Sequence, residues 1–91
     1  MASLSRHAED KLQQLAAQGV TREDVEATIE SPDLILSDAK TGNLVAINYA
    51  AKIAVAYSTR GGRRTVTTII YAPGIEDLVR RRRRSGRWNP L

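Results

Sequence analysis

The chain has 91 residues and a mass of 10.0 kDa, which is the size of one small domain. It has no cysteine and a single histidine, His7, so disulfides, thiolate metal sites and a pair of catalytic histidines are excluded, and we expect no metal ion and no cofactor. Residues 1–59 carry five basic and eight acidic residues, whereas residues 60–91 carry nine arginines and two acidic residues; this basic end indicates an anionic partner, with nucleic acid first, an acidic protein second and an anionic membrane third.

Two helices are predicted in the first third of the chain. Ser5 is placed to cap the first helix, whose apolar residues recur at helical spacing, and Gly19 is placed to end it. Thr21 is the expected N-cap of the second helix, with Asp24 at the third helical position to complete a capping box. Residues 31–32 are Ser-Pro and should stop this helix, because the residue before a proline disfavours helical geometry.

After the second helix the apolar pattern changes from helical to alternating. Strands are predicted at 34–37, 44–49, 53–58 and 65–71, and the segments between them fit hairpin turns. A short helix that starts at Ile75 is expected to carry the arginine run away from the sheet. We therefore predict an α+β fold in which two N-terminal helices pack on a four-stranded antiparallel sheet, with a short basic C-terminal helix. Residues 1–79 would form the domain and residues 80–91 an arginine-rich tail.

Five short motifs resemble one known family. Three of them match the opening of small RelE/ParE-superfamily proteins: Ser5-Arg6-His7-Ala8, Gly19-Val20-Thr21 with Val25, and Ile29-Glu30-Ser31-Pro32-Asp33. The predicted strand sequences at 53–57 and 68–71 resemble the third and fourth strands of an uncharacterised group related to the BrnT toxins, which carries a Ser/Thr-x-His-Ala signature. The resemblance covers roughly residues 4–72. It implies a helix-helix-sheet fold and, for characterised relatives, an RNA-cleaving toxin that an antitoxin neutralises.

The residue types needed for metal-independent RNA cleavage are present. Such cleavage needs a base for the ribose 2′-hydroxyl, cations around the phosphorane and an acid for the leaving oxygen. His7 and Lys11 lie four residues apart and should share one face of the first helix. The alternative for each candidate is structural: a surface histidine, solvated hairpin charges or a packing tyrosine. The predicted catalytic residues are His7, Lys11, Arg60, Arg64 and Tyr71.

The other arginines of the basic end are candidates for phosphate binding, because a planar guanidinium can bind phosphate through two parallel hydrogen bonds. The alternative is a solvated tail in a chain that favours arginine generally, since the sequence has eleven Arg and three Lys. Trp88 could stack on a base or fold back onto the domain, and we expect it to fold back because a small core benefits from one large ring. The predicted nucleic-acid-binding residues are Arg63, Arg80, Arg81, Arg82, Arg83, Arg84 and Arg87.

These features predict an RNA-acting toxin-type protein, a metal-independent endoribonuclease of a toxin–antitoxin system. The alternatives are a non-catalytic RNA- or protein-binding module with the same fold, and a gyrase-directed toxin of the ParE type. The expected partners are RNA, including ribosome-associated mRNA, an acidic antitoxin and a second copy of the chain. A membrane is not expected, because the longest apolar stretch, 49–57, is too short to span a bilayer. The N-terminus lacks a signal-peptide pattern, so a cytoplasmic location is predicted.

Overall fold

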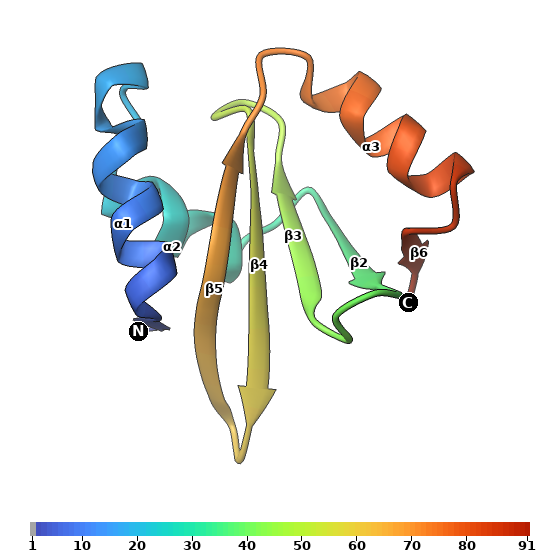
Figure 1. Ribbon diagram of the computed structural model, residues 1–91, viewed down its shortest axis with the longest axis horizontal. Helices are drawn as coiled ribbons and strands as arrows, with labels where there is room; N and C mark the ends of the chain where they lie inside the picture. The colour runs from blue at the N-terminus through green and yellow to red at the C-terminus, as the bar shows by residue number, and fades with distance from the viewer. Residues whose placement is uncertain (1) are drawn as a thin grey trace.

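A mixed β-sheet forms the centre of the structure, a computed structural model that describes residues 2–91 (Figure 1). In this part of the chain the sheet has six strands in the order β1-β5-β4-β3-β2-β6. The four central strands pair antiparallel, β6 joins β2 antiparallel, and β1 joins β5 in parallel. The strands are β1 (Ser3–Leu4), β2 (Leu34–Asp38), β3 (Leu44–Asn48), β4 (Ile53–Arg60), β5 (Arg63–Tyr71) and β6 (Trp88–Pro90).

The predicted sheet of four antiparallel strands under two helices is therefore wrong, although the α+β class is compatible with the structure. All four predicted strands are present, but two short strands extend the sheet at its two edges. Strands of two and three residues are too short to show an alternation of apolar and polar side chains, so the sequence pattern did not reveal them. Pro90 in β6 is typical of an edge strand, because proline has no N–H to donate to a further strand.

The two N-terminal helices begin at the predicted caps. The Ser5 side chain accepts a hydrogen bond of 3.1 Å from the Ala8 N–H at the start of α1 (Arg6–Leu15). Thr21 Oγ1 accepts from the Asp24 N–H, and Asp24 Oδ2 accepts from the Thr21 N–H at 2.9 Å, which confirms the capping box of α2 (Arg22–Glu30). Gly19 adopts the left-handed conformation, with a φ of 83°, after the 3-10 helix η1 (Ala16–Gln18) that extends α1.

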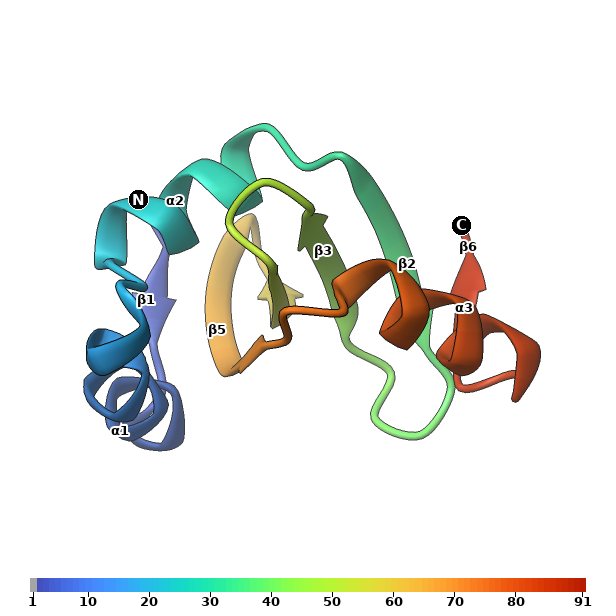
Figure 2. The same ribbon diagram turned by 90° about the horizontal axis from the view of Figure 1, so that it is seen from above.

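Helices cover both faces of the sheet. Figure 2 shows α1 and α2 over one end of the curved sheet and α3 (Ile75–Arg84) over the other. The side chains of β4 alternate between these two layers, because those at positions 53, 55 and 57 pack in the cluster that includes α1 and α2, whereas Ala54 and Ala56 pack in the cluster that includes α3. A strand buried on both faces is apolar along its length, which explains the nearly continuous apolar run from Ile53 to Tyr57.

The third helix does not carry the arginine run away from the sheet as predicted. Ile75 and Val79 are buried on α3 and pack with Leu36 of β2 and Trp88 of β6. After α3 the chain turns at Gly86, with a φ of 80°, and returns to pair with β2. The apolar stripe of α3 explains this path, because it can be buried only against the free face of the sheet. The predicted return of Trp88 onto the domain is confirmed, since 2% of this residue is exposed.

The packing of Trp88 generates a test of the C-terminal strand. Trp88→Ala should lower the free energy of unfolding by about 3–5 kcal/mol, because it removes a large buried ring from the cluster under α3. Leu91→Ala is the matched control, since Leu91 is 77% exposed and its loss should cost less than about 0.5 kcal/mol. Urea denaturation followed by circular dichroism measures both. Equally small losses of unfolding free energy in the two variants would show that β6 is not part of the folded core.

Candidate functional site

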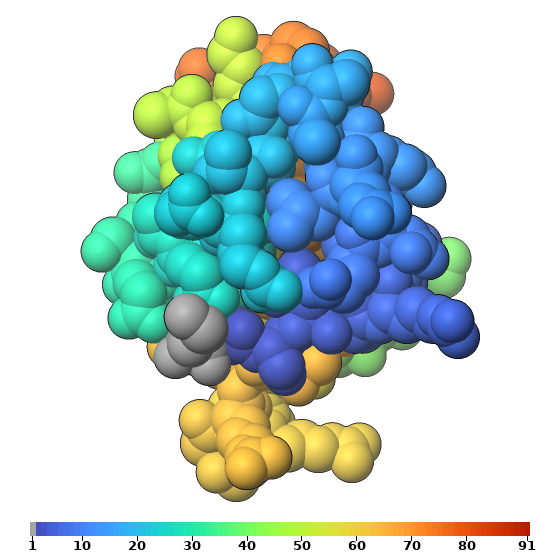
Figure 3. Space-filling view, turned by 90° about the vertical axis from the view of Figure 1, so that its left-hand side faces the viewer, coloured from blue at the N-terminus to red at the C-terminus, as the bar shows by residue number. Residues whose placement is uncertain are grey.

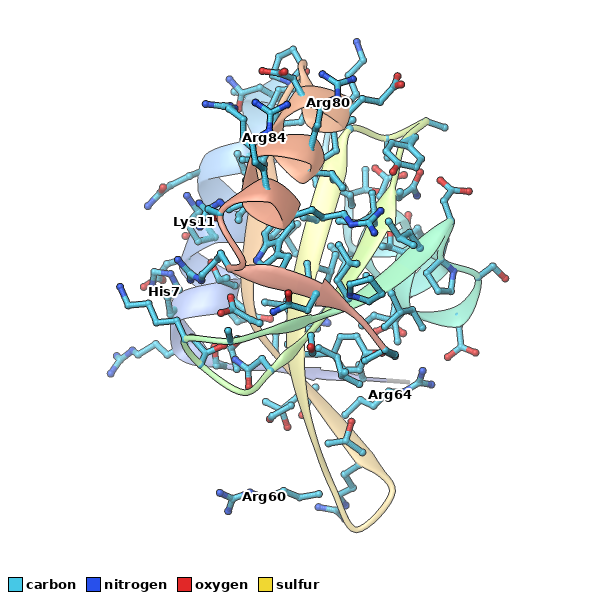
Figure 4. The ribbon with its side chains drawn as sticks, turned by 90° about the vertical axis from the view of Figure 1, so that its right-hand side faces the viewer. His7, Lys11, Arg60, Arg64, Arg80 and Arg84 are labelled. Atoms are coloured by element: carbon cyan, nitrogen blue, oxygen red, sulfur yellow. The ribbon has the colours of Figure 1, made fainter. Side chains whose placement is uncertain are left out.

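The predicted catalytic residues lie at separate places on the molecule (Figure 4). His7 is exposed on α1 and Lys11 is one turn further along the same helix, as the four-residue spacing predicted. Arg64 lies on the opposite side in this view and forms an ion pair of 2.8 Å with Glu30 at the end of α2. The structure therefore brings His7 and Lys11 together but places Arg64 away from them, beside a carboxylate that neutralises it.

The fifth predicted catalytic residue is separated from the arginines by the length of β5. Tyr71 ends this strand and packs partly buried against the cluster under α1 and α2, whereas Arg64 is near the strand's beginning. Seven residues of extended strand span about 23 Å at roughly 3.3 Å per residue. Tyr71 and Arg64 therefore cannot contact the same phosphate group, and Arg60, in the hairpin before β5, is further still from Tyr71.

Two of the arginines predicted as site residues, Arg60 and Arg63, lie on a projecting hairpin. The turn between β4 and β5 extends beyond the body of the molecule, as the gold segment in Figure 3 shows. Gly61 and Gly62 both have positive φ, 55° and 79°, which a two-residue hairpin turn of this twist requires. Arg60 and Arg63 are directly paired across this turn and are exposed. The hairpin thus presents two guanidiniums to solvent, away from α3.

The arginine run forms the outer side of α3. Arg80 and Arg81 share one carboxylate, that of Asp77, at 3.1 and 3.4 Å, and such exposed pairs contribute little to stability. Arg83 and Arg84 are exposed and form no ion pair within residues 2–91. Four cations therefore face solvent on a helix whose opposite side is packed on the sheet.

Arg82 differs from its neighbours because it points toward the domain. It follows Leu78 by four positions and Val79 by three, so it continues the side of α3 that faces the sheet. Its guanidinium carbon lies 5.3 Å from the centroid of the Trp88 ring, within the range of a cation–π interaction. Helical geometry thus directs four of the five consecutive arginines to solvent. The fifth, Arg82, lies on the side of α3 that faces the sheet.

Asp38 holds the C-terminal segment in place. This carboxylate is 6% exposed, and its Oδ1 accepts hydrogen bonds from Arg87 Nε at 2.8 Å and from the backbone N–H groups of Lys40 and Thr41. Its Oδ2 accepts from Trp88 Nε1 at 3.3 Å. Burial raises the pKa of Asp38, but the hydrogen bonds from Arg87, Lys40 and Thr41 and the charge of Arg87 outweigh burial, so this pKa lies below its usual value. The hydrogen bond to Asp38 in turn raises the pKa of Arg87, whose charge serves this structural pair.

A cavity of about 280 Å³ lies between the sheet, α3 and the turn that connects β2 to β3. Ala54, Ala56 and Ile70 form an apolar part of its lining, Thr68 and Asn43 contribute polar groups, and Arg82, Arg87 and Trp88 also line it. The alternation of β4 explains the space, because alanines occupy the positions that face α3. No predicted site includes this cavity, although alanines that alternate with Ile, Val and Tyr along one buried strand are a visible signal of it.

A β-bulge shapes the wall of the cavity. Thr67 is left unpaired, because Ala56 pairs with Thr68 while Tyr57 pairs with Val66. The Thr67 hydroxyl donates to the Ala56 carbonyl at 3.2 Å and accepts from Asn43 Nδ2 at the same distance. The bulge therefore fixes the Asn43 amide from the turn between β2 and β3 against β5.

Comparisons of the chain with protein-family models, with curated proteins and with solved structures find no match. The resemblance to the RelE/ParE superfamily stays a prediction. Within residues 2–91 no group of three His, Cys, Asp or Glu side chains is arranged to hold a metal ion. None of the helices in these residues combines the length and hydropathy needed to cross a bilayer.

The Asp38 network generates a pH-dependent prediction. Asp38→Asn should lower the free energy of unfolding at pH 7 by about 1–3 kcal/mol, because it weakens hydrogen bonds to a buried charged acceptor. Since the folded pKa of Asp38 is depressed, its stabilising contribution is complete above the unfolded pKa of about 3.9 and is lost as the pH falls through the folded pKa. Urea titrations between neutral and acid pH should show the difference between wild type and variant shrinking below about pH 4.

The control for this prediction is Asp10→Asn, which changes an exposed carboxylate on α1. Its free energy of unfolding at neutral pH should stay within about 0.5 kcal/mol of the wild-type value. A wild-type stability advantage over Asp38→Asn that is the same at every pH would contradict the role given to the Asp38 charge.

Proposed function

We propose that the protein is a non-catalytic module that binds RNA through the outer side of α3. The α3 arginine surface consists of Arg80, Arg81, Arg83 and Arg84. The observation that carries the proposal is that these four guanidiniums are exposed on a helix packed against the sheet, with one carboxylate, Asp77, paired to them within residues 2–91. The choice of RNA as the nucleic acid rests on the sequence resemblance to RelE/ParE-superfamily proteins.

The geometry of the α3 arginine surface suits a phosphate backbone. Successive helical residues turn by 100°, so the four guanidiniums spread over the outer side of α3 and do not converge on one atom. Such a surface contacts backbone phosphates without reading base edges. The negative C-terminal end of the helix dipole also favours cations in the last turn, but each is worth roughly 0.3–1 kcal/mol, and one or two would satisfy it.

Cleavage is not part of the proposal, because the residues that would carry it are dispersed. A general base must lie within hydrogen-bond reach of the hydroxyl it activates, while cations contact the same phosphorane. His7 and Lys11 lie on α1, Arg64 is paired with Glu30, and Tyr71 is at the far end of β5. This arrangement favours binding without cleavage.

The first test of this function removes charge from the α3 arginine surface. The triple variant Arg81→Gln, Arg83→Gln and Arg84→Gln should bind a labelled single-stranded RNA at least about tenfold more weakly, because up to three phosphate contacts are lost. The slope of log affinity against log salt concentration should fall in magnitude by about 2, at roughly 0.7 for each phosphate on a single strand. Fluorescence anisotropy at several salt concentrations measures both quantities.

A matched control removes the same charge from the other side of the molecule. Arg6→Gln, Lys11→Gln and Arg22→Gln change three basic residues on α1 and α2. This control should alter the affinity by no more than about threefold, since charges more than about 10 Å from the RNA are screened by salt. An equal loss of RNA affinity in both triple variants would exclude α3 as the specific RNA contact. If the α3 triple variant left the salt slope of RNA binding unchanged, the α3 arginines would instead be assigned to binding an acidic protein.

The absence of cleavage is tested separately. RNA incubated with the wild-type protein should be recovered intact on a denaturing gel, both as free RNA and on ribosomes, because the candidate base His7 lies on α1 and not on the α3 arginine surface. His7→Ala should give the same result as wild type. Cleavage by the wild-type protein that His7→Ala abolishes with the fold intact would contradict the non-catalytic assignment and support the ribonuclease hypothesis.

A further inference from the structure

We propose that the cavity under α3 takes one unstacked base of a single-stranded RNA, with an adjacent phosphate on Arg82. The inference deepens the RNA-binding function and rests on it. It assigns a second kind of contact to the same side of the molecule: the α3 arginine surface would bind the backbone, and the cavity would select single strands.

The apolar lining of the cavity fits a flat aromatic ligand. Ala54 and Ala56 line the cavity with small methyl side chains, which leave an apolar surface with open space above it. Ile70 lies beside them on β5. The volume of about 280 Å³ is close to the lower end of the roughly 300–1,000 Å³ typical of small-molecule sites. The cavity can therefore hold one base, whereas a base pair in a stacked duplex cannot enter it.

Unpartnered polar groups line the same cavity. Asn43 Nδ2 is committed to Thr67, which leaves the Asn43 amide oxygen as a free acceptor. Neither that oxygen nor the Thr68 hydroxyl has a hydrogen-bond partner among the residues that the structure describes. An acceptor and a hydroxyl above an apolar surface are the groups that can pair with the polar edge of a splayed-out base.

The charge at the cavity is suited to a phosphate. Of the two arginines that line it, Arg87 is neutralised by Asp38, whereas Arg82 forms no ion pair within residues 2–91. Arg82 instead lies over Trp88, so one side of its guanidinium contacts the ring. Its N–H groups can still donate to a phosphate, and its neighbours Arg81 and Arg83 belong to the α3 arginine surface.

Trp88 supplies a local reporter for a direct test. It is the one tryptophan of the sequence and it lines the cavity, so its fluorescence should respond saturably to added 5′-AMP. Arg82→Ala should weaken AMP binding at least about tenfold, in line with a charge-assisted hydrogen bond of about 1.5–3 kcal/mol. Arg60→Ala removes the same charge from the hairpin between β4 and β5, outside both the cavity lining and the α3 arginine surface, and should change AMP binding by less than about twofold.

Amide NMR spectra provide a second readout, because Arg82→Ala also changes the surroundings of the Trp88 ring. AMP should shift the signals of Asn43, Ala56 and Thr68 and leave those of α1 unchanged. If AMP causes no saturable change in either measurement, or if Arg82→Ala and Arg60→Ala weaken its binding equally, the cavity is not a base site and the inference is overturned.

A cavity-filling variant tests the preference for single strands. Thr68→Leu should weaken binding of an unstructured RNA oligonucleotide by about 5- to 150-fold, as expected for the loss of one stacked base worth roughly 1–3 kcal/mol. The same oligonucleotide annealed to its complement should bind wild type and variant equally. Thr65→Leu is the matched control, since it makes the same change on β5 outside the cavity lining.

These outcomes separate the inference from the function on which it rests. If the α3 triple variant flattens the salt slope but Thr68→Leu binds single strands like wild type, RNA binding stands and the base site is overturned. If the wild-type protein binds no RNA, the proposed function fails. A base site for RNA then fails with it, whether or not AMP binds to the cavity. Should Thr68→Leu fail to fold, Asn43→Ala replaces it, with a severalfold loss expected on single strands and none on the duplex.

Discussion

A single buried carboxylate determines where the basic end of the molecule lies. Asp38 ends β2, and it accepts hydrogen bonds both from its own turn and from Arg87 and Trp88. A buried carboxylate without partners would carry a large desolvation penalty, so the native state has to bring donors to it. Two of those donors, Arg87 and Trp88, come from the chain just after α3, and their hydrogen bonds fix β6 beside β2 and the C-terminal end of α3 over the sheet. The position of the arginine run and the cavity beneath it both follow from this contact.

The sheet separates two layers with different packing. On the side of α1 and α2, large β4 side chains such as Ile53 and Tyr57 fill the space under the helices. On the side of α3 the same strand offers Ala54 and Ala56, and the space they leave is filled only in part by Trp88. One strand sequence thus produces a closed core on one face and a hollow on the other.

Local signals in the sequence predicted the elements well. The capping box joins Thr21 and Asp24, three residues apart, and the alternation within β4 and β5 is visible over short windows. The edge strands depend on partners far along the chain, since Ser3 of β1 pairs with Thr65, and nothing in two residues shows that pairing. The same contrast holds for the candidate site. Helical spacing joined His7 to Lys11, whereas the distance of Tyr71 from the hairpin depends on how far β5 extends, from Arg63 to Tyr71.

The attachment of α3 has a consequence for the motions of the molecule. The segment from Ile75 to Pro90 crosses one face of the sheet and meets it through its own apolar cluster, separate from the cluster under α1 and α2. Proteins open locally in contiguous cooperative units whose stability reflects the contacts that each unit makes. This segment has the features of such a unit, so its amide hydrogens can exchange with solvent through a partial opening that leaves the central hairpins folded. The layer that carries the arginines can then open while the layer of α1 and α2 stays folded.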